Sequence, residues 1–306
     1  MQTQIIDGYQ LANKIQQHLV NELINSNLNK KIVVAAILFE EDKGSQLYTQ
    51  LKKEMAESLG IEYQVFSFSV KTKFDQVLTQ IQQLNRDDNV TGIIIQKPWR
   101  KTWLNAFQLT TEEGKDKFDY WWRQLVGCLT PKKDVDGLHP SNLTAIKTGD
   151  WRAQGRVLPA TCQATIRLLE QAFQTDQLFA YLRNNQLKTV ILGKSDLLGQ
   201  PLFSILSAKK CKVEIIGSQE LNQRIEQGNN LKDADVIVTA TGRKNLITGD
   251  LIKDGVVVID VGEPYGDVDT ASVIGKARAI TPVPGGVGPM TVISLMENAI
   301  YLGKNS

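Results

Sequence analysis

The apolar run VVAAILF at residues 33–39 decides the fold of the first half of this chain. An unbroken run of this kind, with no polar alternation, is typical of a strand buried on both faces in a parallel sheet. Helical spacing follows at residues 45–59, and Gly60 stands where a left-handed residue ends a helix. Residues 63–68 alternate and predict a second strand.

The same alternation of elements extends in both directions from this stretch. Residues 74–84 return to helical spacing, and residues 91–96 predict another buried strand. Upstream, residues 8–25 predict an amphipathic helix with Leu11, Ile15, Leu19 and Leu23 on one face. The order of strands and helices predicts an α/β layer with parallel strands and right-handed crossovers.

Residues 97–130 interrupt this rhythm with the polar stretch TTEEGKDK and the aromatic stretch FDYWW. We expect a surface excursion with one short helix, in which Trp121 and Trp122 pack the insertion onto the body. A binding role for these two tryptophans is the alternative.

Short β-branched runs return in the second half, at residues 190–192, 213–216, 236–239 and 256–261. Thr161 is expected to cap the start of a helix whose apolar positions are Ile166, Leu169 and Phe173, and residues 288–302 show helical spacing. The fold class expected is therefore α/β in two domains, the second a Rossmann-type dinucleotide-binding domain.

Length and charge are those of an ordinary globular protein. A chain of 306 residues suggests two domains, and the net charge of +2 is too even to imply a nucleic acid or membrane partner. The three cysteines are far apart and form no CxxC pair, so no metal site is expected and a reducing cytoplasm is favoured. No signal peptide is expected at the N-terminus.

Tyr48 and Lys52 are four residues apart on a predicted helix and therefore share a face. A lysine becomes a useful proton carrier when burial lowers its pKa, although on this pair alone an ordinary surface lysine is the simpler interpretation. Gln96 ends a buried strand, and ligands of parallel sheets bind beyond such ends. A neutral amide there would orient a lysine without pinning it as an ammonium.

Asp134 and Asp136 lie in KDVDG, between the two halves. In an extended segment both side chains would lie on one face, and a carboxylate pairs well with the N–C–NH2 edge of a pterin or purine. A solvated acidic turn is the alternative.

The loop GKSDLLGQP follows the strand at residues 190–192, so its glycine and the next helix could receive a phosphate. Lys194 and Ser218 would suit the 2′-phosphate of NADP, whereas Glu220 would suit the ribose hydroxyl of NAD. The stretch TPVPGGVGPMT at residues 281–291 predicts a rigid loop suited to a flat ring.

Together these stretches resemble the bifunctional methylenetetrahydrofolate dehydrogenase/cyclohydrolase family over nearly the whole chain. The resemblance rests on the motifs IIDGYQLA, SQLYTQLKKEMAESLGI, KDVDGLHPSN, GKSDLLGQP, VVVIDVG and TPVPGGVGPMT, in that order. It implies oxidation of 5,10-methylene-tetrahydrofolate with NADP, with NAD as the alternative, and hydrolysis of the methenyl product to 10-formyl-tetrahydrofolate. It also implies a cytoplasmic homodimer with a cleft between its domains.

The resemblance assigns roles to residues by number. It implies Lys52, Tyr48, Gln96 and Asp136 as catalytic residues, Tyr48, Asp136, Pro282, Gly285 and Gly286 as folate-binding residues, and Gly193, Lys194, Ser195, Ser218 and Glu263 as cofactor-binding residues. Residues 1–145, completed by 288–306, would form the folate domain, and residues 146–287 the dinucleotide domain.

Several positions depart from the family pattern. QKPWR replaces Q-L-P-L-P at residues 96–100, Lys194 replaces an arginine, and Glu263 replaces an isoleucine next to the cofactor. PATCQ at residues 159–163 replaces Pro-Cys-Thr-Pro, and the segment before KDVDG is about twenty residues longer. Two other functions therefore stay open: a paralogue that binds without catalysing, or a dehydrogenase of another small substrate.

Overall fold

The computed structural model describes residues 2–25, 30–228, 230–263 and 265–305. The chain divides into two compact units. Unit 1 comprises Met1–Ile15, Ala145–Asp150 and Pro159–Ser294, and unit 2 comprises Gln16–Thr144, Trp151–Leu158 and Leu295–Ser306. Three helices contribute residues to both units: α1 (Gly8–Asn25), α6 (Pro140–Thr148) and α12 (Val287–Lys304).

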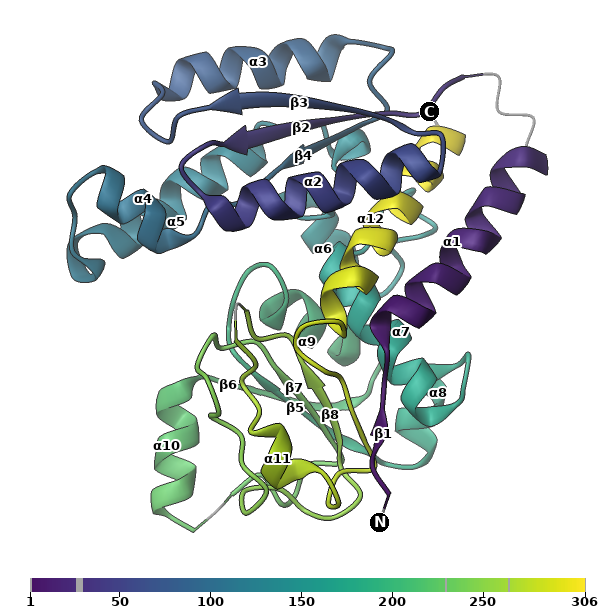
Figure 1. Cartoon of the computed structure of the whole chain (residues 1–306), viewed down its shortest axis with the longest axis vertical. Helices are drawn as coiled ribbons and strands as arrows, with labels where there is room; N and C mark the ends of the chain where they lie inside the picture. Colours follow the sequence, from purple (N-terminus) through teal and green to yellow (C-terminus); the bar gives the residue numbers. More distant parts are fainter. Residues whose placement is uncertain (1, 26–29, 229, 264, 306) are drawn as a thin grey trace. The chain divides into compact units, whose positions relative to one another are not determined.

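Unit 2 is built on a parallel sheet in the order β3-β2-β4. Its elements are β2 (Val33–Phe39), α2 (Lys43–Ser58), β3 (Glu62–Phe68), α3 (Phe74–Arg86), β4 (Gly92–Ile95), α4 (Arg100–Ala106), α5 (Thr111–Gly127) and the 3-10 helix η1 (Pro131–Lys133). Every residue of β2 is buried, which confirms the expected strand with both faces covered. Helix α2 lies along β2 and β3 (Figure 1).

Helix α2 begins and ends as its sequence predicts. The Asp42 carboxylate accepts a hydrogen bond from the Ser45 backbone N–H at 2.8 Å and caps the first turn. Gly60, with φ of 69°, follows the last turn in the left-handed conformation. The buried stripe of the helix includes Thr49 and Lys52, so the lysine faces the sheet and not the solvent.

The insertion at residues 97–130 holds two helices, α4 and α5, where one short helix was expected, so that prediction is wrong. The polar stretch that suggested a loop is the start of α5: Thr110 and Glu113 form a capping box, each side chain bonding the other residue's backbone N–H. Trp122 is buried, and the Trp121 ring lies 5.1 Å from that of Phe39 in β2. The expected packing role of both tryptophans is confirmed.

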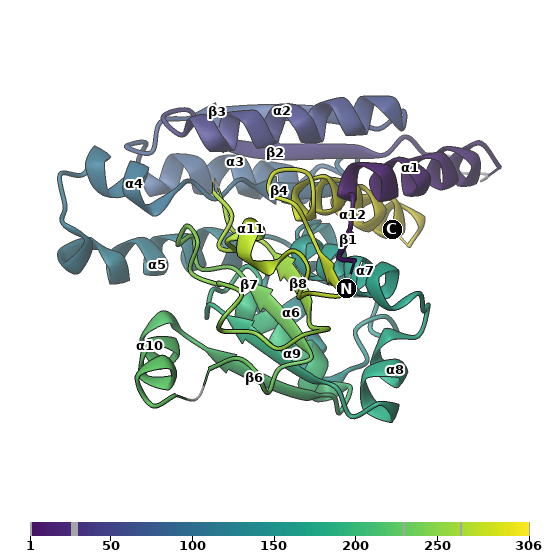
Figure 2. The ribbon, with the colours of Figure 1, turned by 60° about the horizontal axis from the view of Figure 1, so that its bottom comes forward.

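Unit 1 is built on a parallel sheet in the order β1-β9-β8-β7-β5-β6, of which Figure 2 labels β1, β6, β7 and β8. Its elements are β1 (Gln4–Ile5), α7 (Ala160–Phe173), α8 (Leu178–Asn184), β5 (Lys188–Leu192), α9 (Gly199–Ala208), β6 (Lys212–Ile216), α10 (Ser218–Glu226), β7 (Val236–Thr239), β8 (Val257–Asp260), α11 (Thr270–Val273) and β9 (Ala279–Ile280). Helix α9 packs on β5 and β6, and α7 packs on β8. Apolar residues of these strands, such as Val190, Ile237 and Val258, form the buried core. The expected two-domain α/β class is confirmed.

Two local features of unit 1 were not predicted from the sequence. Strand β1 pairs with β9 and extends the sheet by a segment too short to show periodicity. The prediction that Thr161 caps α7 is wrong, because Pro159 occupies the N-cap and Thr161 lies inside the first turn. Among the described residues, no helix is long and apolar enough to cross a membrane.

Candidate active site

Lys52 and Gln96 form the centre of the candidate site in unit 2. The Lys52 ammonium Nζ donates a hydrogen bond of 2.8 Å to the Gln96 side-chain oxygen. Lys52 lies on the buried face of α2. Gln96 directly follows β4, and its backbone N–H donates to the Ile37 carbonyl at 2.9 Å, which fixes the end of this strand. The structure thus brings together two side chains that lie 44 positions apart in the sequence.

Burial controls the protonation of Lys52, whose exposed fraction is 6%. Removal from water disfavours the ammonium and lowers the pKa of Lys52, while the negative charge of Asp136 acts in the opposite direction. Gln96 is uncharged, so it orients the amine without adding to the electrostatic attraction that favours the ammonium. The surroundings therefore move this lysine from a fixed cation towards a group that can exchange protons.

Asp134 and Asp136 serve different purposes in the structure. Their segment follows η1 as a turn and not as a strand, so the premise that both side chains lie on one face is not met. Asp134 is completely buried, and its carboxylate accepts bonds from the backbone N–H groups of Gly137 (3.1 Å) and His139 (2.6 Å) and from the Asn142 amide (2.7 Å). Asp136 is half-buried and acts electrostatically on Lys52.

The structural role of Asp134 was not predicted, although its sequence signal is present. An aspartate three residues before a glycine commonly bonds the backbone of its own turn. Burial raises the pKa of Asp134 to about 6, against the opposing effect of the bonds from His139 and Asn142. Asn298 of α12 adds a second clamp: its amide donates to the carbonyls of Val135 and Leu158, each at 2.9 Å.

Tyr48 lies one helical turn before Lys52 and is half-buried. Positions four apart share a helix face, so the phenol and the amine are neighbours on α2. The structure places Tyr48, Lys52, Gln96 and Asp136 in unit 2.

The proline-rich loop belongs to unit 1, with Pro282, Gly285 and Gly286 following β9. The opening motif of the chain supports it: the Gly8 N–H donates to the Gly285 carbonyl at 2.9 Å, and the Tyr9 ring lies against Gly285. A Cβ added at Gly8 would come within 1.8 Å of the Gly286 carbonyl oxygen. Only glycine at position 8 therefore lets the two backbones approach this closely.

The predicted cofactor residues lie at the carboxyl edge of the unit 1 sheet, where parallel sheets bind ligands. Gly193 follows β5 with φ of 111°, and an added Cβ would lie 2.5 Å from the Ala240 carbonyl oxygen. The Ser195 hydroxyl accepts from the backbone N–H groups of Leu198 (3.3 Å) and Gly199 (3.5 Å), at the start of α9. This tight turn into a helix N-terminus fits a dinucleotide phosphate.

Lys194 and Ser218 lie near each other at this edge, together with Glu220. Lys194 forms an ion pair with Glu220, which also accepts the Gly217 backbone N–H at 3.0 Å and so caps α10. Ser218 is the first residue of α10. Lys194, whose charge suits a 2′-phosphate, is thus paired with Glu220, which suits a ribose hydroxyl.

Glu263 is exposed in the loop after β8, near the loop that follows β7. Two buried aspartates shape these loops. Asp260 accepts from the backbone N–H groups of Gly262 (2.8 Å) and Val268 (3.0 Å), and burial raises its pKa to about 6. Asp267 accepts from the Thr241 N–H at 2.6 Å. The motif VVVIDVG predicted the strand, but it did not indicate that Asp260 shapes these loops.

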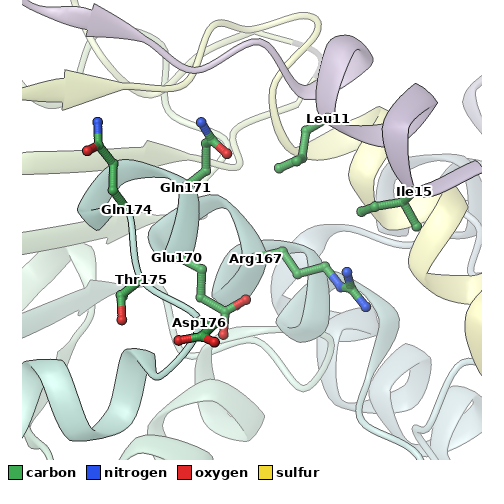
Figure 3. A pocket seen from close by; sticks show the side chains of 8 residues that line it. All are labelled: Leu11, Ile15, Arg167, Glu170, Gln171, Gln174, Thr175 and Asp176. Carbon is green, nitrogen blue, oxygen red and sulfur yellow. The ribbon is translucent and has the colours of Figure 1, made fainter. Parts of the chain in front are cut away.

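Unit 1 also has a surface pocket of about 510 Å³ between α7 and the start of α1 (Figure 3). It is lined by Leu11, Ile15, Arg167, Glu170, Gln171, Gln174, Thr175 and Asp176. None of these residues was assigned chemistry from the sequence. The described ranges contain no group of three or more His, Cys, Asp or Glu side chains that could hold a metal ion.

The fold and these side chains define a two-domain α/β enzyme with a parallel dinucleotide-type sheet and a buried lysine–amide pair. Known sequences and structures agree. The tetrahydrofolate dehydrogenase/cyclohydrolase catalytic domain matches residues 6–116, and the NAD(P)-binding domain of the same family matches residues 159–306.

Individual relatives match over almost the whole chain. The Bifunctional protein FolD of Lactobacillus gasseri is 32% identical over 98% of this chain and 97% of its own length. The FolD structure from Campylobacter jejuni has a TM-score of 0.80 and 30% identity, with 99% of each chain covered. The FolD of Trypanosoma brucei, solved with NADP and an inhibitor, has a TM-score of 0.80 and 26% identity, covering 100% of this chain and 98% of its own. The chain belongs to the tetrahydrofolate dehydrogenase/cyclohydrolase family.

Proposed function

We propose that this chain oxidises 5,10-methylene-tetrahydrofolate to the 5,10-methenyl form with NADP, and then hydrolyses that product to 10-formyl-tetrahydrofolate. The observation that carries the proposal is the bond of 2.8 Å between the buried Lys52 amine and the Gln96 amide. A lysine kept from water beside a neutral partner is suited to repeated proton transfer.

Asp136 is proposed to grip the pterin edge through paired hydrogen bonds, while Tyr48 supports the ring system. The turn that carries Asp136 is held rigidly by Asp134 and Asn298, so its carboxylate is presented in a fixed place. Rigid placement matters because misplacement of a reacting group by about 1 Å costs on the order of a hundredfold in rate. Pro282, Gly285 and Gly286 are proposed to bind the folate through their backbone.

NADP is the proposed cofactor, with NAD as the alternative. The turn of Gly193 and Ser195 into α9 would hold the diphosphate, and Lys194 with Ser218 would hold the 2′-phosphate. Glu263 would lie beside the bound cofactor. When bound, the dinucleotide supplies the acceptor for the hydride of the one-carbon unit.

The oxidation needs no acid from the protein. The hydride leaves the bridging carbon with its electron pair, and the lone pair of N5 or N10 stabilises the resulting iminium. The chain contributes binding and orientation through Asp136 and Tyr48.

Hydrolysis is where Lys52 acts. A water molecule adds to the methenyl carbon as the Lys52 amine takes one of its protons. The bond from that carbon to N5 then breaks as the formyl C=O forms, N5 receives a proton from the Lys52 ammonium, and the added hydroxyl releases its remaining proton to solvent. The overall step consumes one water and releases one proton, and Gln96 holds the amine in place throughout.

Replacing Lys52 with methionine tests the proposal. The variant is expected to lose hydrolysis and to keep at least part of the hydride transfer, because only hydrolysis needs the amine. Cofactor reduction is followed with NADP and with NAD, and decay of the methenyl absorbance reports hydrolysis. Lys53→Met is the control, since this neighbouring side chain is 43% exposed and pairs only loosely with Glu57.

Retained hydrolysis in a folded Lys52→Met protein contradicts the role of the lysine. A wild-type protein that reduces neither cofactor with the folate substrate favours a paralogue without catalysis. The absence of a folate-dependent thermal shift favours a dehydrogenase of another substrate, because a ligand that binds only the folded state raises its stability.

The division of labour along the chain is also a proposal. Residues 1–145 with 288–306 would bind folate, and residues 146–287 would bind the dinucleotide. This division concerns ligands and not backbone units, since strand β1 of the first segment pairs with β9 in unit 1. A homodimer, a cytoplasmic location, and the lack of nucleic acid or membrane partners remain predictions, which sedimentation and fractionation would test.

A further inference from the structure

Tyr63 of β3 carries a buried phenol that the proposed mechanism does not use. Its exposed fraction is 8%, and its hydroxyl has no hydrogen-bond partner among the described residues. An unpaired buried hydroxyl costs stability, and replacement by phenylalanine would avoid that cost. A hydroxyl kept in such a place therefore calls for an explanation.

The register of the sheet shows which face Tyr63 occupies. Tyr63, Val34 and Gly92 form one row across β3, β2 and β4. Side chains in such a row of a parallel sheet lie on the same face. Val135 lies on this face too, because a Cβ added at Gly92 would come within 2.0 Å of the Val135 Cγ2 atom. The residue that follows Val135 is Asp136.

The other members of the candidate site lie on the same side. Gln96 is four positions beyond Gly92, so the two-residue period of the strand returns it to the same face. Gln96 accepts the bond from Lys52, which places the amine there as well. Tyr63 therefore faces the layer that contains Lys52, Gln96 and the turn of Asp136.

The charges of this layer agree with that placement. Burial raises the pKa of Tyr63, and the charge of Asp136 raises it further. The charge of Asp136 acts on three other titratable groups: Lys52 from α2, Tyr63 from β3, and Asp134 of its own turn. Because the phenol keeps its proton at neutral pH, it serves as a hydrogen-bond donor and not as a base.

We propose that Tyr63 is a positioning residue for the hydrolytic step: in the folate complex its phenol O–H donates directly to the Asp136 carboxylate and holds it for the folate. This inference rests on the function proposed above. A carboxylate held in this way attracts the Lys52 ammonium less strongly, so the amine stays more readily deprotonated. Removing the phenol oxygen frees Asp136 to pair with Lys52, which raises the pKa of the lysine.

Tyr63→Phe tests the proposal because it removes one oxygen and little else. Hydrolysis at neutral pH should fall about five- to twentyfold, and the acidic limb of its pH profile should move up by about one pH unit, as expected for the loss of one charge-assisted bond. Hydride transfer at saturating folate should change by less than about threefold, since the amine has no part in it, whereas the KM for folate should rise in both reactions because Asp136 also grips the substrate. In the ligand-free protein, where this hydroxyl is buried and unpaired, the midpoint of urea unfolding should rise in the variant.

Thr189→Val is the matched control. Thr189 lies in β5 of unit 1, and its buried hydroxyl also lacks a partner within the described ranges. This variant should gain stability and leave both activities and the pH profile unchanged. Near-wild-type hydrolysis with an unmoved acidic limb in Tyr63→Phe overturns the inference and leaves the hydroxyl a structural feature.

The two proposals fail in different ways. If the wild type hydrolyses methenyl-tetrahydrofolate and Lys52→Met does not, the proposed function stands whatever Tyr63→Phe shows. If Lys52→Met retains hydrolysis, the proposed role of the lysine fails and the inference on Tyr63 fails with it. A folate-dependent thermal shift in Tyr63→Phe establishes that the variant is folded and binds substrate.

Discussion

Gly92 couples the sheet of unit 2 to the turn that carries Asp136, and Gly92→Ala tests this coupling. The added Cβ would lie 2.0 Å from the Val135 Cγ2 atom and 3.6 Å from its Cβ. Carbon atoms that are not bonded prefer a separation of about 3.5–4.0 Å, so the methyl must retreat by about 1.5 Å or more. Val135 is completely buried, which leaves the turn as the part that moves.

The size of the effect follows from that displacement. Overpacking of a buried position costs about 1–3 kcal/mol in the free energy of unfolding. A shift of about 1 Å in a substrate-gripping group is expected to lower kcat/KM on the order of a hundredfold. Both effects should appear in Gly92→Ala, with the loss concentrated on folate-dependent reduction of the cofactor.

A double-mutant cycle isolates the contact. Val135→Ala alone removes the colliding methyl and should cost about 2 kcal/mol through lost burial. In the double variant the two changes compensate, so its free energy of unfolding should exceed the additive expectation by about 1–2 kcal/mol and most activity should return. Urea unfolding and cofactor reduction measure the two quantities.

Gly127→Ala serves as the control, because a Cβ at this helical position meets no atom within 4 Å. Wild-type activity and stability in Gly92→Ala, or strictly additive costs in the double variant, would refute the coupling between β4 and the turn.

Three further predictions concern neighbouring groups. Burial raises the pKa of Asp134 to about 6 from 3.8, so its contribution to stability is present below about pH 4 and is lost as pH rises through 6. At 1.36 kcal/mol per pKa unit this contribution amounts to roughly 3 kcal/mol. Asp134→Asn should therefore flatten that part of the pH dependence of urea unfolding. Asn298→Leu removes the donor of the Val135 and Leu158 carbonyls and should lower the free energy of unfolding by about 2–4 kcal/mol, so a loss below about 0.5 kcal/mol contradicts the clamp. Glu220→Gln keeps the helix cap but removes the charge that pairs with Lys194, and it should lower the KM for NADP about three- to tenfold with little effect on NAD; an equal change for both cofactors argues against a 2′-phosphate site there.

Much of the candidate site could be predicted because its signals are short in range or rest on motifs. The four-residue spacing of Tyr48 and Lys52 predicts a shared helix face, and Gln96 marks the end of a strand. The separate tasks of Asp134 and Asp136 could not be predicted from alternation, because that argument assumed an extended segment and the chain turns there. The second helix in the insertion was missed because its capping box is polar and resembles a loop.

By itself, the sequence determined the order of strands and helices, since burial on one or both faces leaves a period in the chain. Only the tertiary structure decided that Lys52 is buried against Gln96, that Asn298 holds the Val135 carbonyl, and that the phenol of Tyr63 faces the same layer. Those contacts join residues far apart in the chain. Their geometry depends on sheet register and side-chain packing, which no local period encodes.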